Sequence, residues 1–432
     1  MALSIKNLNI YKFLKFLSIN LTSVFIPIFV YSTTKSIPLT LLYLIFSSII
    51  TISFNLILKN VFSKHFNLTL VLSFIVFIPS QLLIIFNNMN PYLYMVIMAF
   101  SQGIDKVLTN SLVDYLYNLS PKSEDAKNLK DTYLVGACAI ILSSIVGGVM
   151  LEYLHNAYTI GLAIFISLVS MIFILVKVNK IKKCGNMEDE SKNETVKEEP
   201  KEASIKEEPK NIKVIDNQKK INPNRKYVLI LAVSLMLIIG VYLRGQLTWG
   251  IYLDIENIKL TVIGIVNALI PLGQIITNYL IYKFTLKNNE NLLLAISSVA
   301  IGICWILRLF LLDNFSIYFF TVVIGILDPF LYQPIKYIYL HSLKQYTKPS
   351  SYLYLDECVR QVGCLLCSLI GIIFSFLGVT GLKVMYIISA VILMLASIIY
   401  MFLNRRLKKV DADSDNKEKE NEENINGDEN NL

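Results

Sequence analysis

The chain has little charge for its length. Of its 432 residues only 17% are charged, and there are three histidines and six cysteines. A soluble protein of this size would carry charged faces on amphipathic helices. Here 54% of the residues are hydrophobic, and apolar runs long enough to cross a bilayer core recur from end to end. The composition therefore indicates a polytopic membrane protein.

Motifs of several common catalytic sites are missing from the sequence. There is no GxxxxGK[ST] phosphate loop, no HExxH zinc motif and no GxSxG nucleophile elbow. Cys364 and Cys367 have CxxC spacing, but they lie in an apolar run without a histidine or acid at ligand spacing. Free cysteine in such a place packs as a small hydrophobe. We therefore expect no enzyme activity, no cofactor and no metal site.

The net charge of +8 would suit a nucleic-acid partner, but its placement points elsewhere. The basic residues lie in the connections beside the apolar runs, where they act as a topology signal. We therefore expect the lipid bilayer and a small-molecule substrate as partners, and no nucleic acid.

Twelve candidate membrane spans follow from the apolar runs, each close to the 20 or so residues that cross a bilayer. The first six are Phe13–Tyr31, Ile37–Leu58, Phe66–Phe86, Pro91–Asp114, Tyr133–Leu154 and Tyr158–Val178. The second six are Tyr227–Tyr252, Leu260–Phe284, Leu292–Leu312, Ser316–Leu340, Val359–Leu377 and Val384–Leu403.

A polar, highly charged segment, residues 179–226, divides the chain into two similar halves. It contains the string Lys-Glu-Glu-Pro-Lys twice, at 197–201 and 206–210. Such a segment buries too little apolar surface to offset the entropy lost on ordering. We therefore predict a disordered linker at 179–226 between six-helix bundles at 1–178 and 227–404, and a disordered tail at 405–432.

Lysine and arginine alternate between the connections and so predict the orientation. The basic connections include Lys59 and Lys64, the 122–130 loop, the linker and Lys344, whereas the opposite connections hold little more than Lys35, Lys259 and Lys383. The positive-inside rule then places both termini and the linker in the cytoplasm. We expect a multi-pass protein of the plasma membrane.

The two halves repeat each other. Gly103-Ile104-Asp105 in the fourth span corresponds to Gly325-Ile326-Leu327-Asp328 in the tenth. The fifth and eleventh spans are both rich in small residues, which let helices approach closely. An all-α protein built from two pseudo-symmetric six-helix bundles is therefore predicted.

Six spans, a long polar connection and six more spans resemble the major facilitator superfamily (MFS) over the whole chain. Gln102-Gly103 and Gly147-Gly148 match parts of the family's fourth- and fifth-helix signatures. Ala99 and Ser143-Ser144 stand where those signatures have Arg and Gly-Pro. The resemblance implies a central cavity lined by helices one, four, seven and ten.

The fourth span carries a polar side that is the first candidate site. Gln102 and Asp105 lie on one helical stripe, and Lys106, Asn110 and Asp114 lie on the next at i, i+4 and i+8. Charges near the bilayer centre are costly and usually face a cavity or a partner. Two roles are open for them: binding of substrate or protons, or holding helices together. Asp114 lies close enough to the cytoplasm to be solvated or to form a gating pair.

The tenth span repeats this spacing with Asp328, Tyr332 and Lys336, beside Pro329 and Pro334. Each proline removes a backbone donor and favours a kink next to the acid. Lys336, like Asp114, lies near the cytoplasmic end, where a solvated or gating role is expected rather than substrate contact.

The seventh and ninth spans add further candidates. Arg244, Gln246 and Trp249 lie in the seventh and Arg308 in the ninth. Arg244 either faces the cavity or extends towards the headgroups, Arg308 is near enough to the outer side to reach the interface, and Trp249 is either a cavity residue or an interfacial anchor.

Taken together, these features predict a secondary active transporter that works by alternating access, with Asp105 and Asp328 coupling to protons or contacting a cationic substrate. Lys106 and Arg244 would instead suit an anionic group. Proton-coupled export is favoured because the family's exporters carry the matching helix signatures most often. Uptake of a small metabolite is the second reading, and a transporter-like signalling or scaffold protein is the third.

Overall fold

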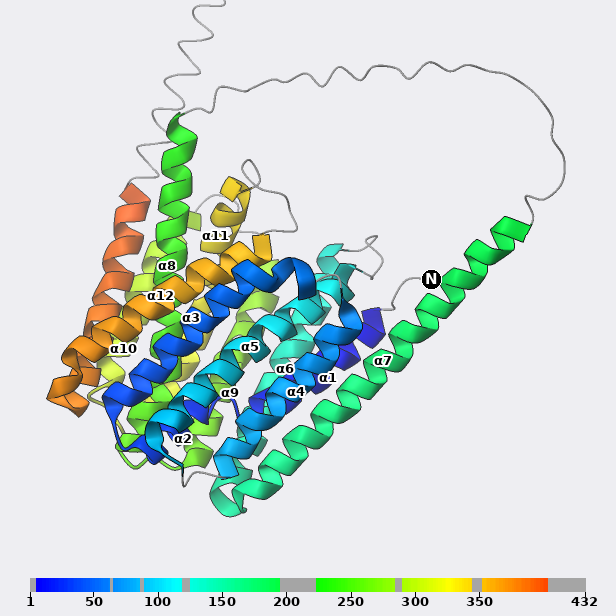
Figure 1. The fold of residues 1–432 in the computed structure, drawn as a ribbon. Coiled ribbons are helices and arrows are strands. Elements are labelled where there is room, and N and C mark those ends of the chain that lie inside the picture. Colours follow the sequence, from blue (N-terminus) through cyan, green and yellow to red (C-terminus); the bar gives the residue numbers. More distant parts are fainter. Residues whose placement is uncertain are drawn as a thin grey trace, which may run out of the picture.

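The structure is a computed structural model that describes residues 5–62, 65–85, 89–118, 125–194, 223–283, 290–343 and 352–402. These residues form helices joined by short turns and contain no strand (Figure 1). The helices of the first half are α1 (Ile5–Asn20), α2 (Ile26–Thr34), α3 (Ile37–Phe62), α4 (Phe66–Ile85), α5 (Pro91–Asn118), α6 (Asp125–Tyr153) and α7 (Asn156–Glu194). Those of the second half are α8 (Pro223–Ile255), α9 (Leu260–Lys283), α10 (Glu290–Arg308), α11 (Asn314–Leu343), α12 (Tyr352–Phe374), η3 (Ser375–Leu377) and a last helix, Val379–Phe402.

The predicted twelve-span architecture is confirmed. Nine helices of the described chain are long and apolar enough to cross a membrane. The other three predicted spans do not meet this criterion of length and hydropathy, each for a visible reason. The first is divided into α1 and α2, the fourth (α5) carries the polar residues of the candidate site, and the ninth has an apolar helix of only Leu292–Arg308.

The first span is broken, whereas the sequence predicted one helix over Phe13–Tyr31. A turn at residues 21–25 separates α1 from α2, and within it the Phe25 amide donates to the carbonyl of Thr22, only three residues back. Pro27 lies in the first turn of α2. Proline has no amide donor and its ring crowds the carbonyl four residues earlier, so a helix can begin at this position but cannot run through it undisturbed.

Several helix ends differ from the prediction. Helix α7 continues to Glu194 and α8 begins at Pro223, so residues 179–194 and 223–226 are helical although they were assigned to the linker. Extending an existing helix needs no new nucleus, and proline suits the first helical position. Residues 195–222 and the tail from 403 lie outside the described residues. Helix α12 begins at Tyr352, seven residues before the predicted eleventh span.

The repeat seen in the sequence has a structural counterpart. Gly103 of α5 packs against Ile50 of α3, the second span, and Gly325 of α11 packs against Ile270 of α9, the eighth span. A threonine hydroxyl lies at each contact: Thr277 donates to the carbonyl of Ile326 at 2.8 Å, whereas Thr51 lies 3.3 Å from that of Gly103 and donates at 2.8 Å to the carbonyl of Ser47 in its own helix. The same pair of helices is therefore in close contact at a glycine in both halves.

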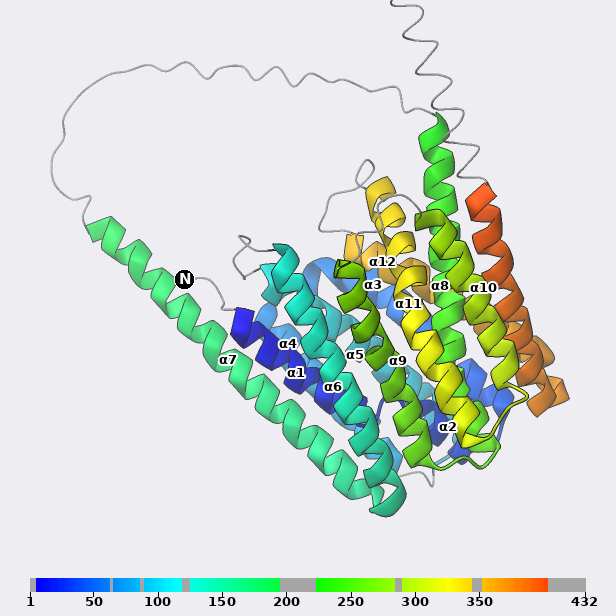
Figure 2. The same ribbon diagram turned by 180° about the vertical axis from the view of Figure 1, so that it is seen from behind.

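The halves meet along α6 and α9 on one side and along α3 and α12 on the other (Figures 1 and 2). The α6–α9 contact depends on small residues. A Cβ atom added to Gly264 of α9 would lie 2.4 Å from the carbonyl oxygen of Ser144, and one added to Gly148 of α6 would lie 2.7 Å from that of Leu260. The backbones of the two helices are thus nearly in contact.

Polarity is distributed as expected for a protein in lipid. Large apolar side chains such as Phe165 and Ile373 are 62% and 63% exposed, whereas many serines and threonines are buried between helices. One continuous apolar cluster spans both halves and includes Phe25 and Ile28 from the first, and Trp249, Tyr252 and Leu253 from the second. The cluster extends along the second half, from Ala232 and Tyr339 at one end to Trp249 and Leu253 at the end where α9 begins.

Candidate functional site

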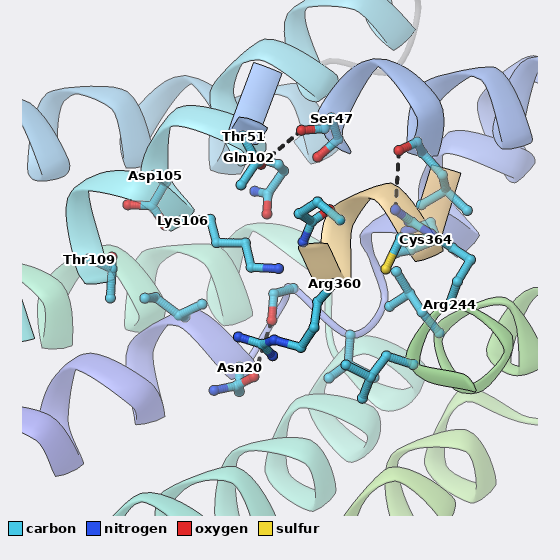
Figure 3. A pocket seen from close by; sticks show the side chains of 18 of the residues that line it. Asn20, Ser47, Thr51, Gln102, Asp105, Lys106, Thr109, Arg244, Arg360 and Cys364 are labelled. Atoms are coloured by element: carbon cyan, nitrogen blue, oxygen red, sulfur yellow. Dashed lines mark hydrogen bonds between the residues drawn. The ribbon is translucent and has the colours of Figure 1, made fainter. Parts of the chain in front are cut away.

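A cavity of about 470 Å³ lies between the two halves (Figure 3). Its wall is formed by α1, the turn that follows it, α2, α3 and α5 of the first half, and by α8 and α12 of the second. Cavities of this size hold small organic molecules in other proteins. The polar lining comes largely from Asn20, Ser23, Ser47, Thr51, Gln102, Asp105, Lys106, Thr109, Asn110, Arg244, Arg360 and Gln361.

Asp105 is buried in the wall and paired within the first half. The ammonium group of Lys15, on α1, lies 3.8 Å from its carboxylate. Lys15 also donates to the hydroxyl of Ser73, on α4, at 3.1 Å, and Ser73 donates to Asp105 at 3.3 Å. Both charged side chains are about one-twentieth exposed. A buried carboxylate that holds its charge needs such a partner.

Lys106, the next residue, reaches across the cavity to the other half, as Figure 3 shows. Its ammonium group lies 2.8 Å from the Glu357 carboxylate on α12. Glu357 also binds Arg360 and accepts a hydrogen bond from Gln361 at 2.7 Å. Asp356 lies 3.5 Å from the Arg360 guanidinium. The result is a compact cluster of two cations and two acids joining α5 to α12.

Arg244 on α8 also crosses between the halves. Its guanidinium donates to the carbonyl of Leu44 at 3.2 Å and to the hydroxyl of Ser48, both on α3. The residue is only 5% exposed and lines the cavity. Among the ion pairs of the described residues none involves Arg244, and its Nε has no hydrogen-bond partner. Of the two placements left open for Arg244, the structure has the one at the cavity, and a role in binding stays a prediction.

Asp328 of α11 is buried within the second half. Gln274 of α9 donates a short hydrogen bond to its carboxylate, and the hydroxyl of Tyr242 lies nearby. Tyr332 contacts Lys336, whose ammonium group is 5.6 Å from the tyrosine ring. None of these side chains belongs to the described cavity wall. The carboxylate of Asp328 instead meets α9, while α3 and α12 provide wall residues that the family resemblance did not imply.

Arg308, at the end of α10, occupies an aromatic cage. Its guanidinium lies 4.0 Å from the ring of Trp249, 5.0 Å from Trp305 and 6.0 Å from Tyr386, and it donates to Gln246 at 3.3 Å. Cation–π contacts stabilise a guanidinium group that is buried away from water. Arg308 is 1% exposed, so it does not extend to the surface, and Trp249 is buried in the cage and is no interfacial anchor.

Five of the predicted site residues therefore line one cavity: Gln102, Asp105, Lys106, Asn110 and Arg244. Six others, Gln246, Trp249, Arg308, Asp328, Tyr332 and Lys336, lie in the second half away from its wall, and a role for them stays a prediction. Asp114 is part of α5, but its side chain lies outside the described residues.

Four charged residues at the cavity were missed: Lys15, Asp356, Glu357 and Arg360. The predicted eleventh span began at Val359 and so placed both acids in a connection. The i, i+3 and i+4 spacing of Asp356, Glu357 and Arg360 was the available sign that a helix already ran through them. Lys15 was used only as a topology signal.

The two cysteines with CxxC spacing face different neighbours. Cys364 lines the cavity and lies 3.3 Å from the carbonyl of Gly240, whereas Cys367 lies 3.6 Å from the hydroxyl of Ser389. Within the described ranges no three histidine, cysteine or acidic side chains come together in a way that would hold a metal ion.

Solved structures with this arrangement are membrane transporters. The chain superposes on a bacterial homologue of the iron transporter ferroportin in its inward-facing state with a TM-score of 0.65 at 11% identity, covering 92% of this chain and 97% of that chain. The POT family transporter PepTSo gives a TM-score of 0.64 at 11% identity, covering 94% and 98%. A variant of the nucleoside transporter NupG gives 0.60 at 12% identity, covering 93% and 99%.

Sequence comparison supplies the family. No curated protein matches the chain by sequence. The sequence model of the Major Facilitator Superfamily, however, matches residues 8–354, most of the chain and parts of both halves. The fold, the repeat and this match agree, and the chain belongs to the major facilitator superfamily.

Proposed function

We propose that this protein is a secondary active transporter that moves a small molecule across the plasma membrane by alternating access. The observation that carries the proposal is a cavity of about 470 Å³ between the halves, with charged side chains from both in its wall. Charges at membrane depth normally mark a substrate or ion pathway. A site shared by two rigid bundles is the arrangement that lets each side open in turn.

We further propose that this conformation is inward-facing. At the end where α9 begins, the halves are joined by Ile28 of α2, which lies beside Gly250 of α8, and by Glu152 of α6, whose carboxylate accepts a 2.7 Å hydrogen bond from the Thr261 amide. Lys35 of the first half lies within electrostatic reach of Asp254 of the second at the same end. The positive-inside rule assigns this end to the outside. The cavity is open to solvent around Lys106, whose side chain is 47% exposed.

Asp105 is the proposed coupling residue. Burial opposes the charge on its carboxylate, while Lys15 at 3.8 Å favours it. A movement of α1 against α5 would change both effects, and the carboxylate would bind or release a proton as the cavity changes its exposure. Asp328, buried without a described ion pair, is the second candidate in the other half.

The proposed direction is export, supported by the partial fourth- and fifth-helix signatures at Gln102-Gly103 and Gly147-Gly148. Uptake of a small metabolite is the alternative for the same fold. A scaffold role would rest on the linker, so deletion of residues 187–217 separates it from transport: a transporter keeps its activity if the spacer remains long enough, and a scaffold does not.

The test is accumulation of a broad panel of toxic compounds and metabolites in an efflux-deficient host. Wild type is compared with Asp105→Asn and Asp328→Asn, with and without collapse of the proton gradient. Asp313→Asn is the matched control, because Asp313 is an exposed acid at the start of α11 whose capping bond to Ser316 an asparagine can also make.

Lower accumulation that disappears with the gradient and with Asp105→Asn, but persists in the control, supports proton-coupled export. Higher accumulation reverses the direction to uptake. Wild-type behaviour of both Asp variants on a transported compound would refute the coupling sites. Failure of every compound to respond would favour the scaffold role over transport.

A further inference from the structure

The charges around the cavity do not cancel, and the imbalance is localised. Lys15 and Asp105 neutralise each other, as do Lys106 and Arg360 with Glu357 and Asp356. These two groups hold three cations and three acids. Arg244 is the remaining described charge in the wall. Among the charged residues of the wall and their ion-pair partners, one positive charge is therefore in excess, and it is on Arg244; Lys336 acts on Asp356 from outside the wall.

The surroundings of Arg244 leave its charge uncompensated. Its contacts are a backbone carbonyl and a serine hydroxyl, and its Nε has no partner. A buried guanidinium has lost most of its hydration, and a neutral acceptor replaces that only in part. The planar fork of donors matches a carboxylate, which accepts two hydrogen bonds at once. An anion in the cavity would supply the missing charge.

The lining next to Arg244 is apolar. Leu243 and Leu247 flank it on α8, and Tyr43, Leu44 and Val24 belong to the facing wall of the first half. These side chains offer contact to a hydrocarbon or aromatic body but no hydrogen bond to a second charged group, apart from the tyrosine hydroxyl. A ligand bound to Arg244 through a carboxylate would therefore place an apolar body on this part of the wall, while the polar residues named above line the rest of the cavity.

We infer that the cavity binds a small organic monocarboxylate, with the carboxylate on Arg244 and the apolar body against Leu243, Leu247 and Tyr43. A single excess positive charge matches one carboxylate better than a phosphate monoester, which carries about −1.5 to −2 at neutral pH. This inference rests on the proposed function only in taking the cavity to be the transport site. It names the substrate class of that site.

The test measures binding apart from transport. The purified full-length protein is placed in nanodiscs of uncharged phosphatidylcholine, and saturable binding of radiolabelled benzoate, octanoate and indole-3-acetate is measured. Phenyl phosphate and benzyltrimethylammonium serve as competitors that keep an apolar body but change the charge. The variants are Arg244→Gln, Arg244→Lys and Lys383→Gln. The last removes a positive charge at the start of the final helix, away from the cavity, and is the matched control.

At least one monocarboxylate should bind saturably, and benzyltrimethylammonium should not displace it. Loss of a charged hydrogen-bond partner predicts binding about ten- to a hundredfold weaker in Arg244→Gln. Arg244→Lys should fall between this variant and wild type, and Lys383→Gln should equal wild type. Thermal unfolding of each variant without ligand shows whether Arg244→Gln is still folded. If it is not, the affinity of Arg244→Lys is compared with that of wild type instead.

No saturable binding of any of the three acids, equal affinity in folded Arg244→Gln, or displacement by the cation would each overturn the inference. So would phenyl phosphate binding tighter than the carboxylates. The same protein in sealed vesicles separates this outcome from failure of the proposed function. If the acid binds but shows no counterflow, the proposal of transport is refuted and the carboxylate site stands. If a cation shows counterflow and no carboxylate does, the carboxylate site is refuted and the proposal of transport stands.

Discussion

Gly264 offers the sharpest test of how the outer end of this protein closes. It lies in the second turn of α9, where that helix meets α6 of the other half, and a Cβ atom placed on it would stand 2.4 Å from the carbonyl oxygen of Ser144 and 3.1 Å from the Cα of Gly148. Ordinary contacts of a Cβ atom begin near 3.4 Å. Both obstacles are helical backbone, so the helices must move apart by about 1 Å to admit one methyl group.

The substitution Gly264→Ala therefore acts as a wedge between the halves. Overpacking of this kind costs about 1–3 kcal/mol, and the gain in helix propensity of alanine over glycine, about 1 kcal/mol, offsets part of it. The strain is present only while the outer end is closed. We therefore expect the outward-open population to rise by about 5- to 150-fold for a shift of 1–3 kcal/mol. The helix propensity of alanine raises overall stability but is the same in both conformations, so it leaves this ratio unchanged.

Spin labels report this opening directly. Tyr92, at the start of α5, and Phe315, at the start of α11, are 64% and 76% exposed at the outer ends of opposite halves. With cysteine at both positions in a background free of native cysteine, the label-to-label distance should lengthen in Gly264→Ala. Gly161→Ala is the matched control, because a Cβ atom on Gly161 of α7 meets nothing within 4 Å. Equal distance distributions in the two variants would refute the wedge argument.

Three further predictions concern polar contacts. A double-mutant cycle with Lys106→Gln and Glu357→Gln should give a coupling free energy of about 1–2 kcal/mol in thermal stability, because Glu357 is buried and Lys106 is half-exposed. A coupling below about 0.3 kcal/mol, the order-of-magnitude limit for independent sites, would contradict the ion pair. Glu152→Ala removes an acceptor from the first turn of α9 and should favour outer opening by about 1 kcal/mol, read from the same label distances. Thr277→Val should lower the unfolding free energy by about 0.5–1.5 kcal/mol. Thr51→Val should lower it by less, because the Thr51 hydroxyl donates at 2.8 Å to Ser47 of its own helix and lies 3.3 Å from Gly103; a larger loss in Thr51→Val would contradict this.

The overall architecture could be predicted from local patterns. Apolar runs of bilayer length and alternating basic connections depend on short segments of chain, and the repeated glycine-acid motif at Gly103 and Gly325 located the equivalent helix contacts. The break in the first span was missed, although Pro27 marks a position at which a helix begins more readily than it continues. Helix ends were less predictable, because a helix can extend beyond the membrane into charged sequence at little cost.

The pairing of charges could not be predicted. Lys106 and Glu357 are far apart in the sequence and belong to different halves, and neither carries a sign of its partner. Asp105 and Asp328 share a motif but sit two and three residues after their glycines, so they point about 100° apart on their helices. One meets Lys15 of its own half and lines the cavity, whereas the other meets Gln274.

The contacts that close the outer end are well matched to a protein that must open there. Those described above are one capping hydrogen bond from Glu152, the close approach of helices at Gly148 and Gly264, the packing of Ile28 beside Gly250, and the electrostatic attraction between Lys35 and Asp254. A transporter can use two conformations only if their free energies differ by a few kcal/mol. A single strong tie, such as a buried ion pair across this end, would hold one state too firmly. Because each polar or steric contact here contributes about 1–3 kcal/mol, altering one should shift the population and leave the fold intact.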